Sequence, residues 1–253
     1  MSDLPNLVHS NYLVPLVLHK IVKGHPKSWE DVTEQAFVSM VDAVGSSWFT
    51  IDDEDYYKKK GCCLTFDDGN LSDFEIVYPI LRERKIGATF FLITEKIGKK
   101  GYLTWSHINE MKSNGMKFGS HSKSHRNMTT LTRNQVISEF IKSKGILEDK
   151  IGDEITSFSY PYGRYSKDLN RLGFSSGYKF IYTSRHGYVR KYSTTIPRNS
   201  INANMALFDI ECILDPNILT RSKWIFEDGA KSITKSLLGH DRYAQIRNQI
   251  FRK

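Results

Sequence analysis

Short apolar segments alternate with segments of helical periodicity along most of this chain, and this alternation constrains the fold more than any other feature. Strands are expected at residues 13–19, 62–67, 88–93, 116–119, 155–160 and 177–182. Helices are expected at 29–44, 74–83, 106–114 and 132–147, with Thr132 as an N-cap. Strands that alternate with helices form parallel βα units, with the helices outside a sheet or barrel. The sequence therefore predicts an α/β fold whose active site gathers at the carboxyl ends of its strands.

Chemically reactive side chains stand where these expected strands end. His19 follows the first strand, Asp67 and Asp68 follow the second, and His121 and Tyr162 follow later ones. The carboxyl ends of parallel strands lie at one edge of a sheet or barrel, so these separate segments are expected to converge. This coincidence indicates a site more strongly than any single motif does.

The adjacent aspartates at 67–68, together with His121 and His125, have the composition of a metal site. One carboxylate and two imidazoles make three ligands and leave room for water, as in catalytic rather than structural zinc sites. The second carboxylate is then free to act as a base. Taken singly, an Asp-Asp-Gly is most often a turn and a histidine pair is most often surface or core, but their order and positions favour a metal site. The remaining histidines without such context are expected on the solvated surface: His9, His25, His107, His186 and His240.

Hydropathy and cysteine content argue against a membrane-spanning protein and against a small protein held together by disulfides. At 253 residues, the chain can bury a full core as one α/β domain. No apolar run approaches the roughly 18 residues of a membrane span, and the first residues lack a signal-peptide pattern. Three cysteines, two of them vicinal at 62–63, do not form a disulfide framework, which suits a reducing, cytoplasmic setting.

The net charge of +8 is unevenly distributed. Residues 216–253 carry eight Lys or Arg against three Asp or Glu, whereas the rest of the chain is nearly balanced. We therefore expect a main domain at 1–215 and a basic, amphipathic helical tail at 216–253. A nearly balanced main domain argues against nucleic-acid binding. The tail either packs on the main domain with its basic face in water or contacts the anionic inner face of a membrane.

Three motifs in order carry a resemblance to a known family: Thr-Phe-Asp-Asp-Gly at 65–69, His121-x-x-x-His125, and Tyr-Pro-Tyr-Gly at 160–163. They resemble the polysaccharide deacetylases with a NodB-homology domain, carbohydrate esterase family four. Trp105 and the Ala-Thr-Phe-Phe segment at 88–91 are similar as well, so the resemblance covers roughly residues 13–214. It implies a distorted, incomplete (β/α) barrel and a reaction that removes an acetyl group from a sugar.

The resemblance also implies roles at the matching positions. Asp68, His121 and His125 are expected to bind the metal, and Asp67 is expected to be the general base. The backbone N–H of Tyr162 is expected to donate to the oxyanion. Two imidazoles and one carboxylate suit Zn²⁺, although Co²⁺, Ni²⁺, Fe²⁺ or Mn²⁺ suit the same ligand set.

The chain departs from the common family pattern in three places. Ser159 stands where the third motif usually begins with an arginine. The usual Asp–Trp fourth motif is not visible in the sequence. A late Leu-x-His motif, the usual source of the general acid, is missing too, and His240 matches it poorly.

A subset of the family, the poly-N-acetylglucosamine deacetylases, resembles this chain better because its motifs are reordered. The segment Leu-Val-Leu-His-Lys-Ile at 16–21 is similar to its N-terminal strand ending in His-x-Ile, which implies that His19 is the general acid. Arg198, in the segment Ile-Pro-Arg at 196–198, would then return an arginine to the site. Two alternatives stay open: His19 as a buried histidine satisfied by a backbone carbonyl, and Arg198 as an ordinary surface ion pair.

Together, these features predict a soluble, metal-dependent N-deacetylase that releases acetate from an N-acetylated sugar or glycan precursor, either free or linked to a lipid or nucleotide. One rival hypothesis keeps the fold and the metal but hydrolyses another amide, such as a formyl group. A second rival is a non-catalytic glycan-binding protein with a relic site. The presence of the base together with all three ligands favours the enzyme, and the oligomeric state stays open.

Overall fold

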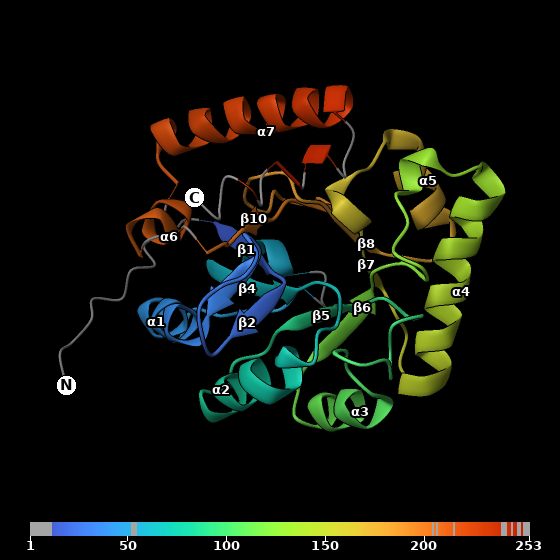
Figure 1. The fold of residues 1–253 in the computed structure, drawn as a ribbon, viewed down its shortest axis with the longest axis horizontal. Helices are drawn as coiled ribbons and strands as arrows, with labels where there is room; N and C mark the ends of the chain where they lie inside the picture. Colours follow the sequence, from blue (N-terminus) through green and yellow to red (C-terminus); the bar gives the residue numbers. More distant parts are fainter. Residues whose placement is uncertain are drawn as a thin grey trace.

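Eight parallel strands form the centre of the fold, and helices surround them (Figure 1). The computed structural model describes residues 12–51, 55–203, 205, 207–214, 216–238, 242, 243, 245, 246 and 249. The strand order is β10-β1-β4-β5-β6-β7-β8-β9, and each neighbouring pair is parallel. These strands are β1 (Leu13–Leu18), β4 (Gly61–Phe66), β5 (Thr89–Leu92), β6 (Lys117–Ser120), β7 (Ser157–Ser159), β8 (Phe180–Tyr182), β9 (Thr195–Ile196) and β10 (Asn199–Ser200).

A helix lies between most successive strands of this sheet, which confirms the expected alternation. The helices are α1 (Glu34–Val44), α2 (Tyr78–Glu83), α3 (Trp105–Ser113), α4 (Arg133–Ile151), α5 (Lys167–Ser175), α6 (Leu207–Leu214) and α7 (Ile218–Leu238). A π-helical turn, Asp73–Val77, leads into α2. Thr132 caps α4 as expected: its hydroxyl accepts the N–H of Gln135, whose side chain in turn accepts the N–H of Thr132.

The two edges of the curled sheet meet through a very short link. β9 pairs with β8 at one edge, and β10 pairs with β1 at the other. Only Pro197 and Arg198 separate β9 from β10 along the chain. The sheet therefore curls into the predicted distorted, incomplete (β/α) barrel, and Arg198 lies at its seam.

The strands are buried on both faces, because helices cover the outside and side chains fill the inside. All six residues of β1 and all six of β4 are buried. Successive side chains point to opposite faces, so Leu64 joins the large cluster shared with the helices, whereas Cys63 joins a smaller one. Phe91 and Tyr182 belong to that smaller cluster, and their ring centres lie 5.4 Å and 5.8 Å from the guanidinium carbon of Arg198. The smaller cluster is thus the apolar wall inside the curl.

Some elements differ from those expected. The expected helix at 29–44 begins later, as α1, because the short strand β3 (Asp31–Thr33) precedes it and pairs with β2 (Lys20–Val22). Thr33 then caps α1 by accepting a hydrogen bond of 3.2 Å from the N–H of Ala36. Helix α5 was not expected. Strands β9 and β10 were not expected either, since two-residue strands carry no readable periodicity.

Two histidines expected in solvent lie elsewhere. The prediction for His186 is wrong: its side chain is buried, and its Nδ1 lies 2.8 Å from Oδ1 of Asp228 on α7. His107 is half-buried, and its Nδ1 accepts the N–H of Thr104 at the start of α3. His25 is exposed, as expected. Outside the described residues lie His9 and His240.

The expected amphipathic tail begins with α7, which crosses one side of the barrel (Figure 1). Trp224 of this helix is buried in the large apolar cluster. Beyond residue 238, the structure describes the tail only at 242, 243, 245, 246 and 249. Within the described part of the chain, no helix combines the length and apolar character needed to span a membrane.

Candidate active site and metal centre

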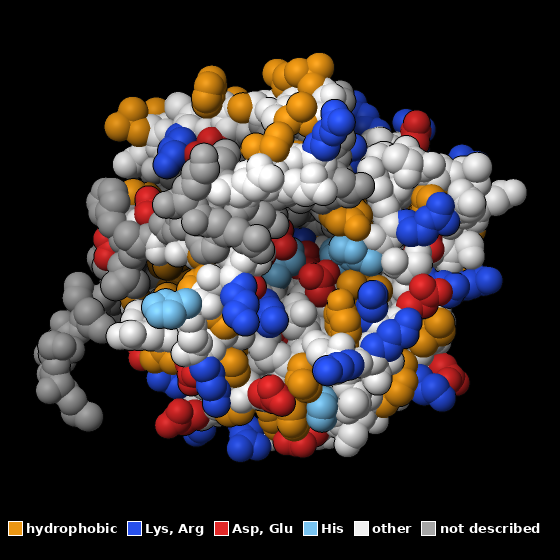
Figure 2. All heavy atoms as spheres, viewed as in Figure 1, with side chains coloured by type: hydrophobic (Ala, Val, Ile, Leu, Met, Phe, Trp, Pro, Cys, Tyr) orange, Lys and Arg blue, Asp and Glu red, His pale blue; other side chains and the backbone are white. Residues whose placement is uncertain are grey.

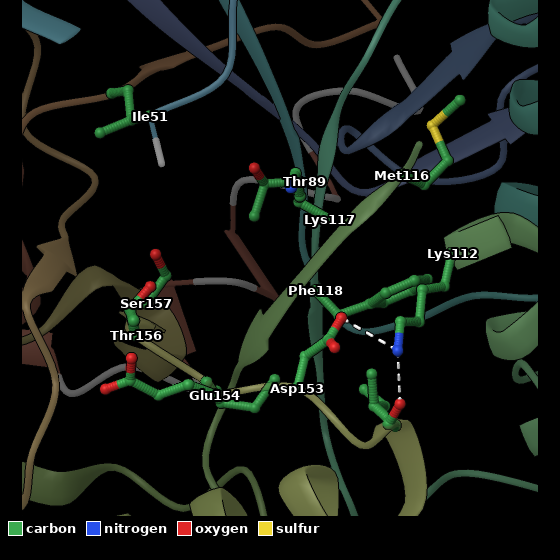
Figure 3. A pocket seen from close by; sticks show the side chains of 12 residues that line it. Ile51, Thr89, Lys112, Met116, Lys117, Phe118, Asp153, Glu154, Thr156 and Ser157 are labelled. Carbon is green, nitrogen blue, oxygen red and sulfur yellow. Dashed lines mark hydrogen bonds and ion pairs between the residues drawn. The ribbon is translucent and has the colours of Figure 1, made fainter. Parts of the chain in front are cut away.

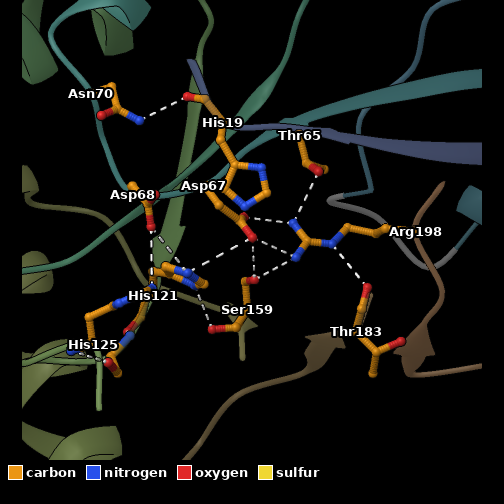
Figure 4. Close-up of polar contacts among 12 residues, drawn as sticks. His19, Thr65, Asp67, Asp68, Asn70, His121, His125, Ser159, Thr183 and Arg198 are labelled. Atoms are coloured by element: carbon orange, nitrogen blue, oxygen red, sulfur yellow. Dashed lines mark hydrogen bonds and ion pairs between the residues drawn. The ribbon is translucent and has the colours of Figure 1, made fainter. Parts of the chain in front are cut away.

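The carboxyl ends of the strands bring the expected site residues together (Figure 4). His19 follows β1, Asp67 and Asp68 follow β4, and His121 follows β6. The space-filling view shows histidine and acidic side chains at the bottom of a hollow near the centre of this face (Figure 2). The convergence expected from parallel strand ends is therefore present in the structure.

Asp68, His121 and His125 form a cluster of three potential metal ligands. One donor atom from each lies within 4.8 Å of the other two. Oδ1 of Asp68 is 3.5 Å from Nε2 of His121 and 3.4 Å from Nε2 of His125. This oxygen is buried, and no described residue donates a hydrogen bond to it. Metal–oxygen and metal–nitrogen bonds of about 2.0–2.2 Å are compatible with these separations, so the cluster suits one divalent ion.

A backbone carbonyl orients the ring of His121. Nδ1 of this ring lies 2.9 Å from the carbonyl oxygen of Ser159. A carbonyl can only accept a hydrogen bond, so Nδ1 carries the proton and Nε2 keeps its lone pair on the side of Asp68. A hydrogen bond of this kind fixes the tautomer and orientation of imidazoles that bind metals.

Backbone strain is concentrated around this cluster. Six described residues other than glycine have positive φ, and four of them are Asp68 (78°), Ser122 (66°), His125 (60°) and Tyr162 (61°). Residues with a Cβ atom avoid this region because of steric clashes, and retained strain of this kind clusters at functional sites. The strain therefore supports a site here rather than a set of ordinary turns.

Asp67 is buried and bound by Arg198 through two parallel hydrogen bonds. Nη1 of Arg198 is 2.7 Å from Oδ1 of Asp67, and Nη2 is 2.7 Å from Oδ2. Burial by itself raises the pKa of Asp67, but the Arg198 guanidinium outweighs burial and holds that pKa well below its usual range. Arg198 is 0% exposed, so it is a buried partner of Asp67 and not a surface ion pair.

Every N–H donor of Arg198 has an acceptor. Besides its two bonds to Asp67, Arg198 donates to the carbonyl of Thr183 (3.1 Å), to the hydroxyl of Thr65 (3.1 Å) and to the hydroxyl of Ser159 (2.7 Å). The Ser159 hydroxyl in turn donates to Oδ2 of Asp67 at 3.1 Å. Ser159, which stands where the third family motif usually has an arginine, thus contacts both Asp67 and Arg198.

The ring of His19 points toward Asp67 (Figure 4). Its backbone carbonyl accepts a hydrogen bond of 2.8 Å from the side-chain amide of Asn70. Nδ1 of the ring is buried, and no described residue forms a hydrogen bond with it. Among the described residues, His19 is therefore not a core histidine satisfied by a backbone carbonyl.

Tyr162 lies in the turn after β7, in the segment Pro161–Gly163. Its ring centre is 4.7 Å from the ring centre of His125. The turn therefore places the ring of Tyr162 against His125, one of the three candidate metal ligands.

Glu139, on α4, is a site residue that the sequence analysis missed. Its Oε2 accepts the backbone N–H groups of Lys123 and Ser124, each at 2.9 Å, and its Oε1 accepts the Ser124 hydroxyl at 2.6 Å. Lys123 and Ser124 belong to the loop that joins His121 to His125. Glu139 therefore ties that loop to a rigid helix. A glutamate within a helix carries no local sequence signal that distinguishes this position from a solvated one.

We expect Glu139→Gln to weaken Zn²⁺ binding by about 10- to 100-fold, the range seen when an outer partner of a metal ligand is lost. A neutral amide loses the charge-assisted hydrogen bonds that hold the loop. Titration calorimetry of the metal-depleted protein measures the effect directly. Glu148→Gln on the same helix is the matched control, because Glu148 instead accepts a hydrogen bond from the N–H of Ile155 and forms an ion pair with Lys144. Equal zinc affinity in the two variants would contradict the role of Glu139.

A second cavity, of about 250 Å³, lies at the opposite ends of the strands (Figure 3). Thr89, Lys117 and Ser157, near the amino ends of β5, β6 and β7, contribute to its wall. Lys112, at its edge, is already paired with Asp153 at 3.0 Å. None of the expected site residues lines this cavity. The candidate site is therefore the hollow at the carboxyl ends.

Comparison with known proteins agrees with this geometry. A family model described as polysaccharide deacetylase matches residues 54–181, just over half of the chain. The chain belongs to the polysaccharide deacetylase family. The matched part of the chain includes Asp67, Asp68, His121 and His125, so the predicted family resemblance is confirmed.

Two curated relatives and one solved structure show which known proteins this chain is similar to. YxkH of Bacillus subtilis (strain 168), named as a polysaccharide deacetylase, is 33% identical over 129 residues, which cover 51% of this chain and 46% of that protein. The poly-β-1,6-N-acetyl-D-glucosamine N-deacetylase of Staphylococcus aureus (strain MRSA252) is 24% identical over 191 residues, which cover 68% of this chain and 65% of that enzyme. The chain thus spans about half to two thirds of the length of these curated relatives.

The solved structure is the Streptococcus pyogenes deacetylase PplD in complex with acetate. It matches with a TM-score of 0.74 and 23% identity, and the match covers 82% of this chain and 100% of that one. At this identity the likeness concerns the fold, and it agrees with the distorted barrel described above.

Proposed function

We propose that this polysaccharide deacetylase is a metal-dependent hydrolase that removes an N-acetyl group from an N-acetylated sugar or glycan precursor and releases acetate. The observation that carries the proposal is an ionised carboxylate, Asp67, held by Arg198 beside the ligand cluster of Asp68, His121 and His125. A fixed base next to a set of metal ligands is the arrangement needed for metal-assisted hydrolysis.

In this proposal, Asp68, His121 and His125 hold the ion, and zinc suits this carboxylate–imidazole set best. A bound ion of this kind lowers the pKa of water toward about 7 and polarises the acetyl carbonyl. Asp67 accepts the proton from the attacking water, a role that requires the carboxylate to be ionised at neutral pH. Arg198 keeps Asp67 ionised and fixes its orientation through both carboxylate oxygens.

Two further residues complete the proposed reaction. His19 donates a proton to the departing amine, and its buried Nδ1, which has no described hydrogen-bond partner, supports this role. The backbone N–H of Tyr162 donates to the developing oxyanion, an interaction typically worth about 2.7–4 kcal/mol of barrier. The left-handed turn that holds Tyr162 beside His125 supports that role.

The name of the Staphylococcus aureus relative supports an N-acetylhexosamine glycan as the substrate class. A nucleotide- or lipid-linked precursor of such a glycan presents the same acetamido group and belongs to the same proposal. We assign the catalytic unit to residues 1–215, since every residue with a proposed role lies within them.

Acetate release from free, nucleotide-linked and oligomeric N-acetylhexosamines tests this proposal, with metal content measured on the same samples. We expect acetate from at least one substrate, loss of activity with a chelator, and recovery on adding Zn²⁺. Formate release from N-formyl analogues without any acetate would show that the substrate is a different amide. A wild-type protein that binds no divalent metal would overturn the proposed metal centre, and bound metal without hydrolysis of any substrate would overturn the enzyme.

A further inference from the structure

Helix α7 presents a row of large apolar side chains to solvent. Their exposed fractions range from 63% to 80%, and the row consists of Ile218, Leu219, Ile225, Phe226, Ile233 and Leu237. In the space-filling view, hydrophobic side chains follow the outer edge of this helix (Figure 2). Contiguous exposed apolar surface is uncommon on soluble monomers and marks interaction sites.

The opposite face of α7 is firmly attached to the barrel. Trp224 is buried, and its ring stacks on the ring of His186 at 6.0 Å between centres. Asp228 accepts the backbone N–H of His186 and also contacts its ring nitrogen. The guanidinium of Arg221 lies 5.1 Å from the ring centre of Tyr188. The apolar row is therefore the outer face of a docked helix and not a core face that failed to pack.

The acidic residues of α7 lie toward the barrel, because Glu227 and Asp228 are both close to His186. Lys223 is 69% exposed, and its Nζ lies 3.9 Å from a carboxylate oxygen of Glu227. In the sequence, the whole tail at 216–253 has eight Lys or Arg and only three Asp or Glu. The tail thus combines an exposed apolar row with an excess of positive charge.

We propose that this face of α7 binds an anionic lipid surface, with the apolar row inserted among the headgroups and the basic residues beside the lipid phosphates. An amphipathic helix lies in a membrane interface when it has one apolar face and a polar face rich in lysine or arginine. Negative lipids attract such basic residues within a Debye length of the surface. A second copy of the chain is a poorer occupant, because each tail carries eight basic against three acidic residues and two tails would repel each other. The proposal does not depend on the deacetylase activity.

Sedimentation of the full chain with lipid vesicles tests the proposal. We expect binding to vesicles of phosphatidylcholine mixed with phosphatidylglycerol, and weaker binding to phosphatidylcholine alone or at high salt. The double variant Ile225→Glu, Phe226→Glu is expected to lower the partition coefficient by at least about tenfold, because two apolar anchors are lost and two negative charges are added. The matched control is Ile141→Glu on α4, which changes another exposed isoleucine (54%) and is expected to leave partition unchanged.

Three outcomes would overturn the lipid proposal. The first is an absence of vesicle binding by the wild-type chain, and the second is equal binding by the double variant. The third is a wild-type dimer in size-exclusion chromatography that the double variant converts to a monomer, which would make a second copy the occupant. Acetate release from a soluble substrate is expected to be unchanged in the double variant, so failure here and failure of the proposed activity are distinguishable.

Discussion

The Asp67→Asn variant is expected to lower kcat for acetate release by about 10²- to 10⁴-fold, the usual contribution of a positioned general base. Asparagine keeps the shape of the side chain but cannot accept a proton from water at neutral pH. Asp67 lies outside the ligand cluster of Asp68, His121 and His125, so metal content is expected to stay close to wild type. Steady-state kinetics combined with metal analysis checks both expectations on the same protein sample.

Asp68→Asn is the matched control for that experiment, because the two aspartates are adjacent but have different proposed roles. This variant is expected to lose metal affinity along with activity, whereas Asp67→Asn loses activity alone. Circular dichroism of both variants shows whether the fold is kept, since Asp67→Asn leaves Arg198 without its buried counter-charge. Wild-type kcat in a folded, metal-containing Asp67→Asn protein would place the base elsewhere.

The Arg198→Met variant is expected to lower the free energy of unfolding by about 3–5 kcal/mol, because it leaves the buried Asp67 carboxylate without its counter-charge. Arg198 is 0% exposed, and each of its N–H donors has an acceptor, so water cannot easily replace it. Arg84→Met is the matched control. Arg84 also forms bidentate hydrogen bonds with an aspartate, Asp42, but this pair lies at the surface. That change is expected to cost only about 0–1 kcal/mol. Urea unfolding of both variants at one metal concentration provides the comparison.

The effect of Arg198→Met is also expected to depend on pH. In the wild type, the folded pKa of Asp67 lies below its unfolded value of about 3.9, so this group stabilises the fold above that pH and ceases to do so as pH falls through the folded pKa. Without Arg198, burial raises the pKa of Asp67, and ionisation at neutral pH then opposes folding. The stability difference between wild type and variant should therefore be largest near neutral pH and shrink below about pH 4. A difference that is constant from pH 3 to 7 would show that lost packing, and not lost charge, causes the destabilisation.

Much of the fold could be predicted because its signals are local. An apolar run such as 62–67 predicts a buried strand from its own residues. Thr132 caps its helix through Gln135, only three positions away. Asp68 and His121 could be predicted as ligands because each stands just after the end of a predictable strand, and His125 because it follows His121 by four residues in the same segment. In a parallel sheet, that position already implies convergence with the others.

Other parts of the site carry no local signal. Arg198 is 131 residues away from Asp67 in the sequence, and it reaches Asp67 only because β9 and β10 join the two edges of the sheet around it. Each of those strands has two residues, which is too short for any periodic pattern. A family resemblance suggested Arg198. Only the structure shows that Arg198 is buried, that it forms bidentate hydrogen bonds with Asp67, and that the Ser159 hydroxyl contacts both residues. The sequence around Glu139 does not distinguish it from a solvent-exposed helical glutamate. Its hydrogen bonds to Lys123 and Ser124 are evident only from the structure.

By itself, the sequence determined the α/β alternation, the residues at the strand ends and the candidate metal ligands, since each depends on side-chain type and on spacing along one segment. The tertiary structure alone decided how the barrel closes and which arginine neutralises Asp67. It also decided which residues orient the ligand loop and which face of α7 remains in solvent. These features depend on contacts between segments far apart in the sequence, whose relative positions are set by the packing of the whole sheet and its helices.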